Sequence, residues 1–352
     1  MISTKRVEQL KYQARHIEIS RPRDPDLDVL QLLPGTWSNV PNMIGRGWNA
    51  IALPFASDMS GIDYRLLVNQ YNEVLKFTLV DRGVKNRGIQ RGTPSFNADQ
   101  VVVALDYEQR IEQIAADDFP ASGLQGERGT TIHHEPGLWL FMINQAEPHC
   151  NVSRLGTIPH GDSLLALGAG TRSAAPPKIP AINGLPIGVN QSLTNPYLAP
   201  YAHFRANPFK GVFDPTEPHK LLVGAIPGTV KWMTKLDVST RVETGGIVNT
   251  PFIVKQANAA EMISTFWICE LEETDAHGNP RLIMQYLQIV LLDFFARRDG
   301  LPGPIRWPHV SINTMEKTAE PDAAKAIVPT SKVRKRSDRR STHPSFPARR
   351  KR

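Results

Sequence analysis

The sequence predicts an all-β protein in which antiparallel strands close into a barrel around an interior the size of a small ligand. Between residues 32 and 315, apolar residues alternate with polar ones or form short runs, and turn residues separate these segments. No stretch of this region keeps a 3.6-residue repeat over the length of a helix, and strands do not alternate with helices. These patterns favour a barrel or sandwich over a doubly wound α/β fold.

Nine segments carry a strand pattern. The clearest pair, residues 262–272 and 281–294, flanks a connection dense in turn-forming residues. We therefore expect Trp267 and Tyr286, which lie on this pair, to be buried. Residues 64–80 are expected to form a hairpin that turns at Asn72 and Glu73. The remaining strands are expected at residues 101–115, 137–143, 163–167, 220–226, 230–242 and 307–315.

Composition divides the chain into three parts. Residues 1–31 are a polar N-terminal extension, residues 32–318 the barrel, and residues 319–352 a basic tail that is expected to lack a fixed structure. Within the barrel, residues 174–219 are rich in Pro but retain five aromatic side chains. A flexible linker would not keep so many aromatic residues, so we expect an ordered insertion that lies over one barrel end.

The charge of the chain is concentrated in the tail. Residues 331–352 hold ten Lys or Arg and one Asp, a net charge of +9, whereas the other residues hold 31 basic and 33 acidic groups, a net charge of −2. A basic tail can contact nucleic acid or an acidic membrane surface, and the alternative is a solvated end without a partner. The tail has a single aromatic residue, Phe346, which argues against a stacking platform for single strands.

Several classes of protein lack support in the sequence. Cys150 and Cys269 are the only cysteines, so no disulfide framework is expected. The N-terminus has no apolar signal segment, and no apolar run is long enough to span a membrane, so we expect a cytoplasmic protein. No CxxC pair, HExxH, GxxxxGK[ST] or strand-linked GxGxxG occurs, which argues against zinc hydrolases, NTPases and nucleotide-dependent oxidoreductases.

Four short motifs hold the candidate functional residues. The first joins Gly35-Thr36-Trp37 to Gly45-Arg46-Gly47-Trp48, which is typical of a strand that opens a ligand-binding barrel. The second is His133-His134-Glu135-Pro136-Gly137. Adjacent histidines on a strand point to opposite faces, so one of them at most could act with Glu135, and a structural or surface role is the alternative.

The third motif, Pro159-His160-Gly161-Asp162, is a tight turn that could present His160 at the barrel mouth. The fourth, Trp307-Pro308-His309, opens the last strand, along which His309, Ser311, Asn313 and Met315 share one face. One histidine entering an apolar barrel would suit haem iron, which needs a single proximal imidazole. The alternative is a strand-end histidine bonded to a loop carbonyl.

Three of these motifs together resemble the nitrobindin-type haem-binding barrel, a calycin-like (lipocalin-like) fold. Gly35-Thr36-Trp37 with Gly45-Arg46-Gly47 resembles the opening of that family, residues 133–137 resemble its central His-x-Glu-x-Gly strand, and Pro308-His309 occupies the place of its closing Pro-His strand. The resemblance implies b-type haem with His309 as the axial metal ligand. It also implies chemistry with nitric oxide, peroxynitrite or peroxide.

Three functions follow as hypotheses. In the first, the barrel binds haem through His309, with Trp307 and Trp48 lining the cofactor site and His160 as a distal acid–base group. In the second, the protein binds an apolar metabolite without metal. In the third, it isomerises or cyclises such a ligand, with His160 or Asp106 as the base. The metal-free pocket would use Trp48, Tyr107, Trp139 and Tyr286.

Overall fold

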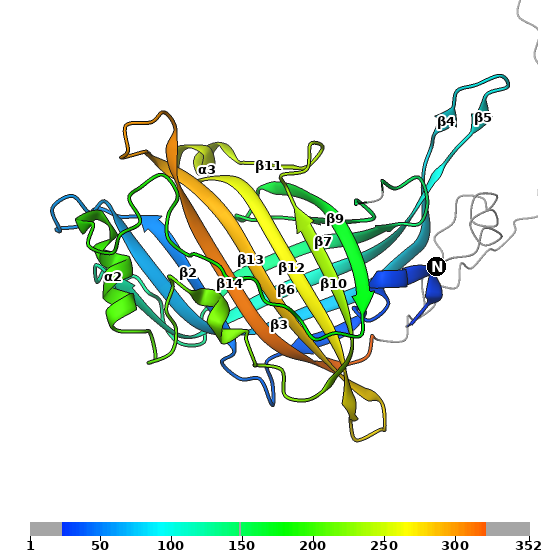
Figure 1. Ribbon diagram of the computed structural model, residues 1–352, viewed down its shortest axis with the longest axis horizontal. Helices are drawn as coiled ribbons and strands as arrows, with labels where there is room; N and C mark the ends of the chain where they lie inside the picture. The colour runs from blue at the N-terminus through cyan, green and yellow to red at the C-terminus, as the bar shows by residue number, and fades with distance from the viewer. Residues whose placement is uncertain (1–22, 148, 322–352) are drawn as a thin grey trace, which may run out of the picture.

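The computed structural model describes residues 23–147 and 149–321 and confirms an antiparallel, calycin-like β-barrel (Figure 1). Ten strands form the closed wall, each paired with the next. In their order around the barrel they are β2 (Gly47–Pro54), β3 (Tyr64–Asn86), β6 (Gln100–Phe119), β7 (Thr131–Met142), β8 (Val152–Gly156), β9 (Ser163–Ser173), β10 (Val230–Ser239), β12 (Asn258–Thr274), β13 (Pro280–Ala296) and β14 (Pro304–Ala319). Most of the N-terminal extension and the tail from residue 322 lie outside the described residues.

Four further strands complete the sheet pattern. Strand β1 (Gly35–Ser38) pairs with both β3 and β14, whereas β14 pairs with β2 only through Val310, Ser311 and Ile312. Strand β11 (Gly246–Val248) pairs with β9, and β4 (Ile89–Gln90) with β5 (Phe96–Asn97) forms a hairpin that projects from the barrel (Figure 1). The barrel is therefore closed through β1 and β2, which pair with successive segments of β3.

Helices in the described part of the chain are short, and all of them have Pro in their first turn, where its missing N–H is harmless. They are the 3₁₀ helices η1 (Pro25–Leu30), η2 (Pro196–Leu198) and η3 (Pro218–Leu221), and the α-helices α2 (Ala199–Ala206) and α3 (Pro251–Gln256). Over residues 23–147 and 149–321, no helix has the length and apolar content that crossing a membrane requires.

Two expected strand assignments are wrong. Residues 64–80 do not turn at Asn72 and Glu73, because β3 runs without interruption and pairs there with Glu112 and Ile111 of β6. The strand must be long, since β1 and β2 pair with successive parts of it. Residues 220–226 do not form a strand either: Pro218 begins a 3₁₀ helix, and turns follow it. Trp267 and Tyr286 are buried, as expected.

Strand alternation assigns each side chain to the interior or to the outer wall. Asn313 of β14 lies opposite Tyr286 of β13, and both side chains bond to Glu73 of β3 across the barrel. Residues in register with them therefore face inward, and their sequence neighbours face outward. By the same rule His309 and Ser311 face the interior and Val310 and Ile312 the outer wall, and the sequence correctly predicted which of these residues share a face.

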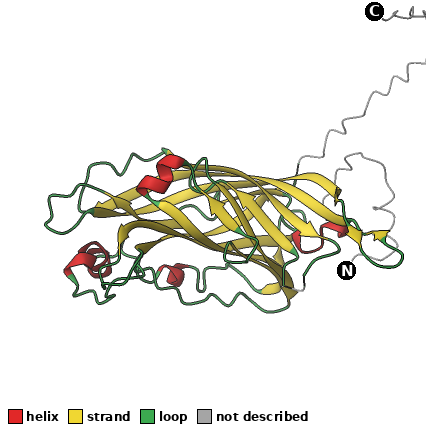
Figure 2. Cartoon of the chain, turned by 90° about the horizontal axis from the view of Figure 1, so that it is seen from above, coloured by secondary structure: helices red, strands yellow, loops and turns green. Residues whose placement is uncertain are grey.

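The Pro-rich insertion packs along the outer wall rather than over a barrel end. Trp48, which is paired with Ile312 on the outer face, stacks on Phe213 with ring centroids 5.5 Å apart. The amide of Gln285, also outward, donates to the carbonyl of Leu222 at 2.8 Å. Figure 2 shows the helices of this segment beside the strands and outside the barrel. The insertion thus extends the hydrophobic core over the outer face of β2, β3, β13 and β14.

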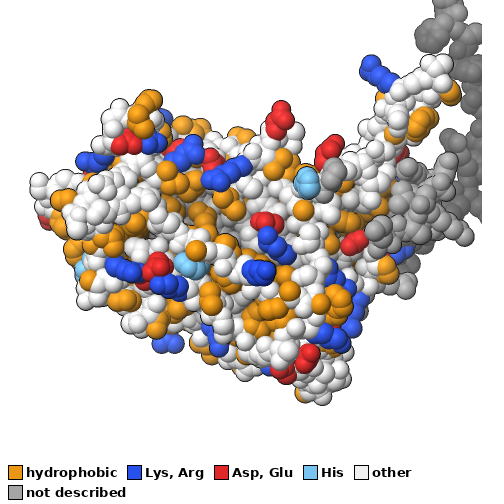
Figure 3. All heavy atoms as spheres, in the orientation of Figure 1, with side chains coloured by type: hydrophobic (Ala, Val, Ile, Leu, Met, Phe, Trp, Pro, Cys, Tyr) orange, Lys and Arg blue, Asp and Glu red, His pale blue; other side chains and the backbone are white. Residues whose placement is uncertain are grey.

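The face of the barrel domain seen in Figure 3 has no large patch of a single charge. Lys and Arg side chains lie among acidic and hydrophobic ones there. This distribution agrees with the nearly balanced charge of the chain outside the tail.

Candidate functional site

A polar network fills the middle of the barrel and is centred on Arg154 of β8. Its guanidinium donates through Nη1 to Gln288 at 2.6 Å and to Ser264 at 3.1 Å, and through Nε to Tyr107 at 3.1 Å. Nη2 lies 3.2 and 3.3 Å from the two carboxylate oxygens of Glu135. The charge of this buried arginine is therefore balanced and all three of its nitrogens are bonded.

Glu135 of β7 is an ionised carboxylate despite its burial. Burial by itself would raise the pKa of Glu135, but the charge of Arg154 and the hydrogen bond from His133 hold that pKa below its usual value. The Tyr107 hydroxyl also donates to it. Gly137 is required beside this contact, because a Cβ at that position would overlap the Tyr107 ring. The His-His-Glu-Pro-Gly motif thus builds the anionic half of the network.

A second carboxylate cluster surrounds Glu73 of β3. Gln109, Tyr286 and Asn313 donate to its two oxygens at 2.7, 2.7 and 2.9 Å. Burial nevertheless outweighs these hydrogen bonds and raises the pKa of Glu73. The Tyr286 hydroxyl also meets that of Tyr71, whose ring passes over Gly47 where a Cβ would clash.

His309 faces the interior from β14, and its Nε2 atom is enclosed without a hydrogen-bonding partner among the described residues. The residue as a whole is partly rather than fully buried. Burial, followed by the charge of His133, lowers the pKa of His309 to about 4. The imidazole is therefore neutral near pH 7, which is the form that binds metals.

His133 lies on the opposite wall, and His134 points away from it, as their adjacent positions predicted. The His133 Nε2 lies 3.3 Å from Glu135, and its ring centroid is 4.8 Å from that of His160. His134 is exposed and pairs with Glu108. His133 therefore lies between the buried Glu135 and the exposed His160.

One more polar atom near His309 lacks a partner. Asn49 of β2 faces the interior opposite Ser311, the next inward residue after His309 on β14. The Asn49 side chain is buried, and its Oδ1 accepts no hydrogen bond from the described residues. Two unsatisfied polar atoms on adjoining strands indicate that a bound molecule could complete this region, because buried polar groups normally have partners.

The structure separates other residues that the sequence grouped into the site. Trp48 does not line the interior, since its ring packs on the insertion. Asp106 points to solvent from β6 and is no interior base. His160 is an exposed loop residue that reaches His133 and accepts a hydrogen bond from the His134 amide. Trp307 belongs to an aromatic cluster with Tyr64, Tyr197 and Phe294.

Three residues of the metal-free pocket, Tyr107, Trp139 and Tyr286, are inside but tightly packed. Sequence reasoning missed Arg154 and Glu73. The signal was present, because each charged residue shares the inward face of its strand with apolar residues, Val152 beside Arg154 and Leu75 beside Glu73. Recognising this pattern requires the correct strand boundaries, and the predicted turn at Asn72 and Glu73 placed Glu73 outside a strand.

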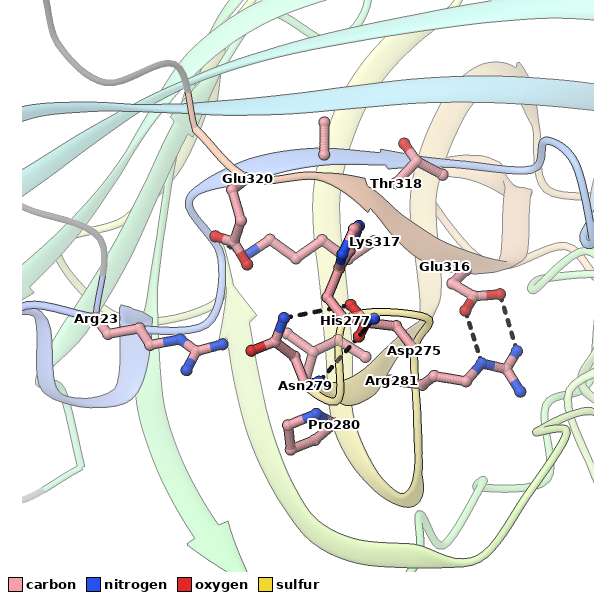
Figure 4. Close-up of a pocket in the computed structure, with 12 residues that line it drawn as sticks. Arg23, Asp275, His277, Asn279, Pro280, Arg281, Glu316, Lys317, Thr318 and Glu320 are labelled. Carbon is pink, nitrogen blue, oxygen red and sulfur yellow. Dashed lines mark hydrogen bonds and ion pairs between the residues drawn. The ribbon is translucent and has the colours of Figure 1, made fainter.

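A surface cavity lies away from these histidines, around the β12–β13 turn (Figure 4). Its volume is about 300 Å³. Two ion pairs lie in its wall, Arg281 with Glu316 at 2.8 Å and Lys317 with Glu320 at 3.1 Å. The charges of these four side chains are balanced within the wall. Within residues 23–147 and 149–321, no group of three or more His, Cys, Asp or Glu side chains is arranged to hold a metal ion.

The fold and the interior define the class of this protein as a calycin-like barrel with a polar, histidine-bearing interior. No protein-family model matches the chain. Neither the curated proteins nor the solved structures give a significant match.

Proposed function

We propose that the barrel binds b-type haem in its interior with His309 Nε2 as the axial ligand. The observation that carries this proposal is the enclosed, unpartnered Nε2 of a neutral imidazole that faces inward. Haem iron needs only one protein ligand, so the proposal does not require a cluster of metal-binding side chains. The resemblance of three motifs to the nitrobindin-type barrel supports the same reading.

Two features of the interior support this proposal. Burial keeps the His309 ring neutral, and the Arg154–Glu135 pair is balanced internally. Bound there, ferric haem would supply chemistry with nitric oxide, peroxynitrite or peroxide. In this reading Trp307 and its aromatic neighbours support the start of β14 and so fix the position of His309.

The test is the visible spectrum of the protein titrated with haemin. Wild-type protein should develop a Soret band at one equivalent, and His309→Ala should lose it or bind haemin loosely with a shifted band. Added imidazole should restore the band. His277→Ala, in the exposed β12–β13 turn, is the matched control and should behave as wild type. An unchanged spectrum in His309→Ala would reject His309 as the ligand.

A second candidate is a metal-free binder of a small molecule, favoured by the unpartnered Asn49 Oδ1, which lies opposite Ser311 on the inward face of the barrel. A ligand with a hydrogen-bond donor would satisfy this acceptor. Wild-type protein that stays colourless with haemin, but releases an organic molecule on denaturation, would favour this candidate. Asn49→Ala should then release that molecule more readily.

A further inference from the structure

The connection from β10 to β12, residues 240–257, exposes apolar side chains to solvent. Val248 is 74% exposed, Phe252 69% and Val254 55%. None of the six residues of α3 is buried, although four of them are Pro, Phe, Ile and Val. Single apolar residues scattered over a surface are normal, whereas three within seven residues form a patch of the kind that marks an interaction site.

Hydrogen bonds hold this connection against the barrel. The side chain of Asn249 exchanges two bonds with the backbone of Ala259, at 2.8 and 2.9 Å. The amide of Thr250 donates to the buried carboxylate of Asp162 at 2.7 Å, and β11 pairs with β9. The connection is therefore anchored through its polar groups, and its apolar side chains remain in solvent.

A second connection adds to the same surface. Strands β12 and β13 are adjacent, with Asn258 opposite Asp293, so the connection from β13 to β14, residues 297–303, leaves the barrel beside α3 (Figure 1). Leu301 on this connection is 58% exposed. The two connections together form what we call the α3 surface.

The α3 surface carries more positive than negative charge. It holds four basic residues and two acidic ones, a net charge of 4 − 2 = +2: Arg241, Lys255, Arg297 and Arg298 against Glu243 and Asp299. The chain outside residues 331–352 has a net charge of −2, so this excess is local. Each of the three arginines pairs with an acidic side chain, whereas Lys255 is exposed and forms no ion pair within the part of the chain that the structure describes.

We propose that the α3 surface docks on an anionic lipid bilayer, with Phe252 and its apolar neighbours entering the boundary between headgroups and acyl chains. A bilayer accepts separate apolar side chains without a matching shape, and the flexible side chain of Lys255 can reach the headgroups. Anionic headgroups also fit the positive excess of this surface. The contact is peripheral and does not depend on what the interior binds, so it stands apart from the haem proposal.

Vesicle binding of the full-length protein tests the proposal. Its partition coefficient is measured by sedimentation with vesicles of phosphatidylcholine and phosphatidylserine. Phe252→Ser should lower this coefficient about tenfold, because one aromatic side chain no longer enters the bilayer. Phe96→Ser is the matched control, since Phe96 is 57% exposed on the β4–β5 hairpin, and it should bind as wild type. Lys255→Gln should weaken binding about fivefold, and only when phosphatidylserine is present.

A second measurement locates the contact, because the basic tail can also attract anionic vesicles. A dye whose emission rises in an apolar environment is attached to Phe252→Cys or, as the control, to Phe96→Cys. Both carry Cys150→Ser, which removes the native cysteine that is not buried. Vesicles should raise the emission at position 252 and leave it unchanged at position 96.

Three results would overturn the proposal. They are an unchanged partition coefficient in Phe252→Ser, equal emission changes at positions 252 and 96, and wild-type protein that does not bind the vesicles. In the last case, sedimentation velocity of the protein alone gives the other assignment. A dimer of wild type that Phe252→Ser dissociates would assign the α3 surface to a second copy of this chain.

Discussion

Arg154 and Glu135 form an ion pair inside the barrel, with Nη2 of the arginine 3.2 Å from Oε1 and 3.3 Å from Oε2 of the carboxylate. Both side chains are almost entirely removed from solvent. Each would be costly to bury alone, because a charge in a low-dielectric interior needs a partner. The pair is therefore a stability element as well as part of the candidate site.

Replacing Arg154 by Met should lower the free energy of unfolding by about 3–5 kcal/mol, because Glu135 would remain as a buried, unpaired charge. Urea unfolding measures this loss. Arg205→Met is the control, since Arg205 also pairs with two carboxylates but on the surface, and its loss should stay within about 1 kcal/mol. Equal losses in the two variants would contradict this account.

Trp267→Ala should cost about 3–5 kcal/mol, the usual range for removing a buried aromatic side chain. Trp267 is 2% exposed. Trp232 on the adjoining strand β10 is 39% exposed, so Trp232→Ala should cost about 1 kcal/mol or less. Thermal or urea unfolding of both variants provides the comparison, and a near-neutral Trp267→Ala would place this strand at an open edge.

Trp48→Ala should loosen the insertion without removing the interior site. Its ring stacks on Phe213 and meets Phe209 edge-on with centroids 6.1 Å apart, so its loss leaves a cavity between the insertion and the wall. Limited proteolysis should then cut within residues 174–222 sooner than in wild type. Val212→Ala, at an exposed neighbouring position, should not change the cleavage pattern. Loss of haemin binding in Trp48→Ala, with the insertion intact, would instead return Trp48 to the ligand site.

The stability of the ligand-free protein should depend on His309 between pH 6.5 and 4. Its pKa falls from 6.5 to about 4 on folding, so the unfolded chain takes up the proton first as the pH decreases. The contribution of the neutral ring is fully present above pH 6.5 and is lost progressively toward pH 4, by roughly 3 kcal/mol in total.

Urea unfolding of wild type and His309→Gln at pH 7 and pH 4.5 tests this. The difference between the two proteins isolates the histidine from the carboxylates that titrate in the same range. Wild type should lose more stability than the variant on acidification, and parallel losses would show that the ring is already protonated in the folded protein.

The local alternation of the sequence determined which residues share a face of a strand. Alternation along residues 307–315 assigned His309, Ser311 and Asn313 to one face, and adjacency alone sent His133 and His134 to opposite faces. These features follow from the two-residue repeat of a strand, which depends only on neighbours in the chain. The turn-rich connection at 274–280 likewise fixed the pairing of β12 and β13.

Only the tertiary structure decided which face is the interior and which distant residues meet there. The position of Trp48 shows the limit, because an inward and an outward Trp have the same local pattern, and the insertion that covers it comes more than a hundred residues later. The continuity of β3 depends on its pairing with β1, β2 and β6, and the meeting of Tyr286 with Glu73 depends on closure of the barrel. These contacts are long-range, and no periodicity within one strand encodes them.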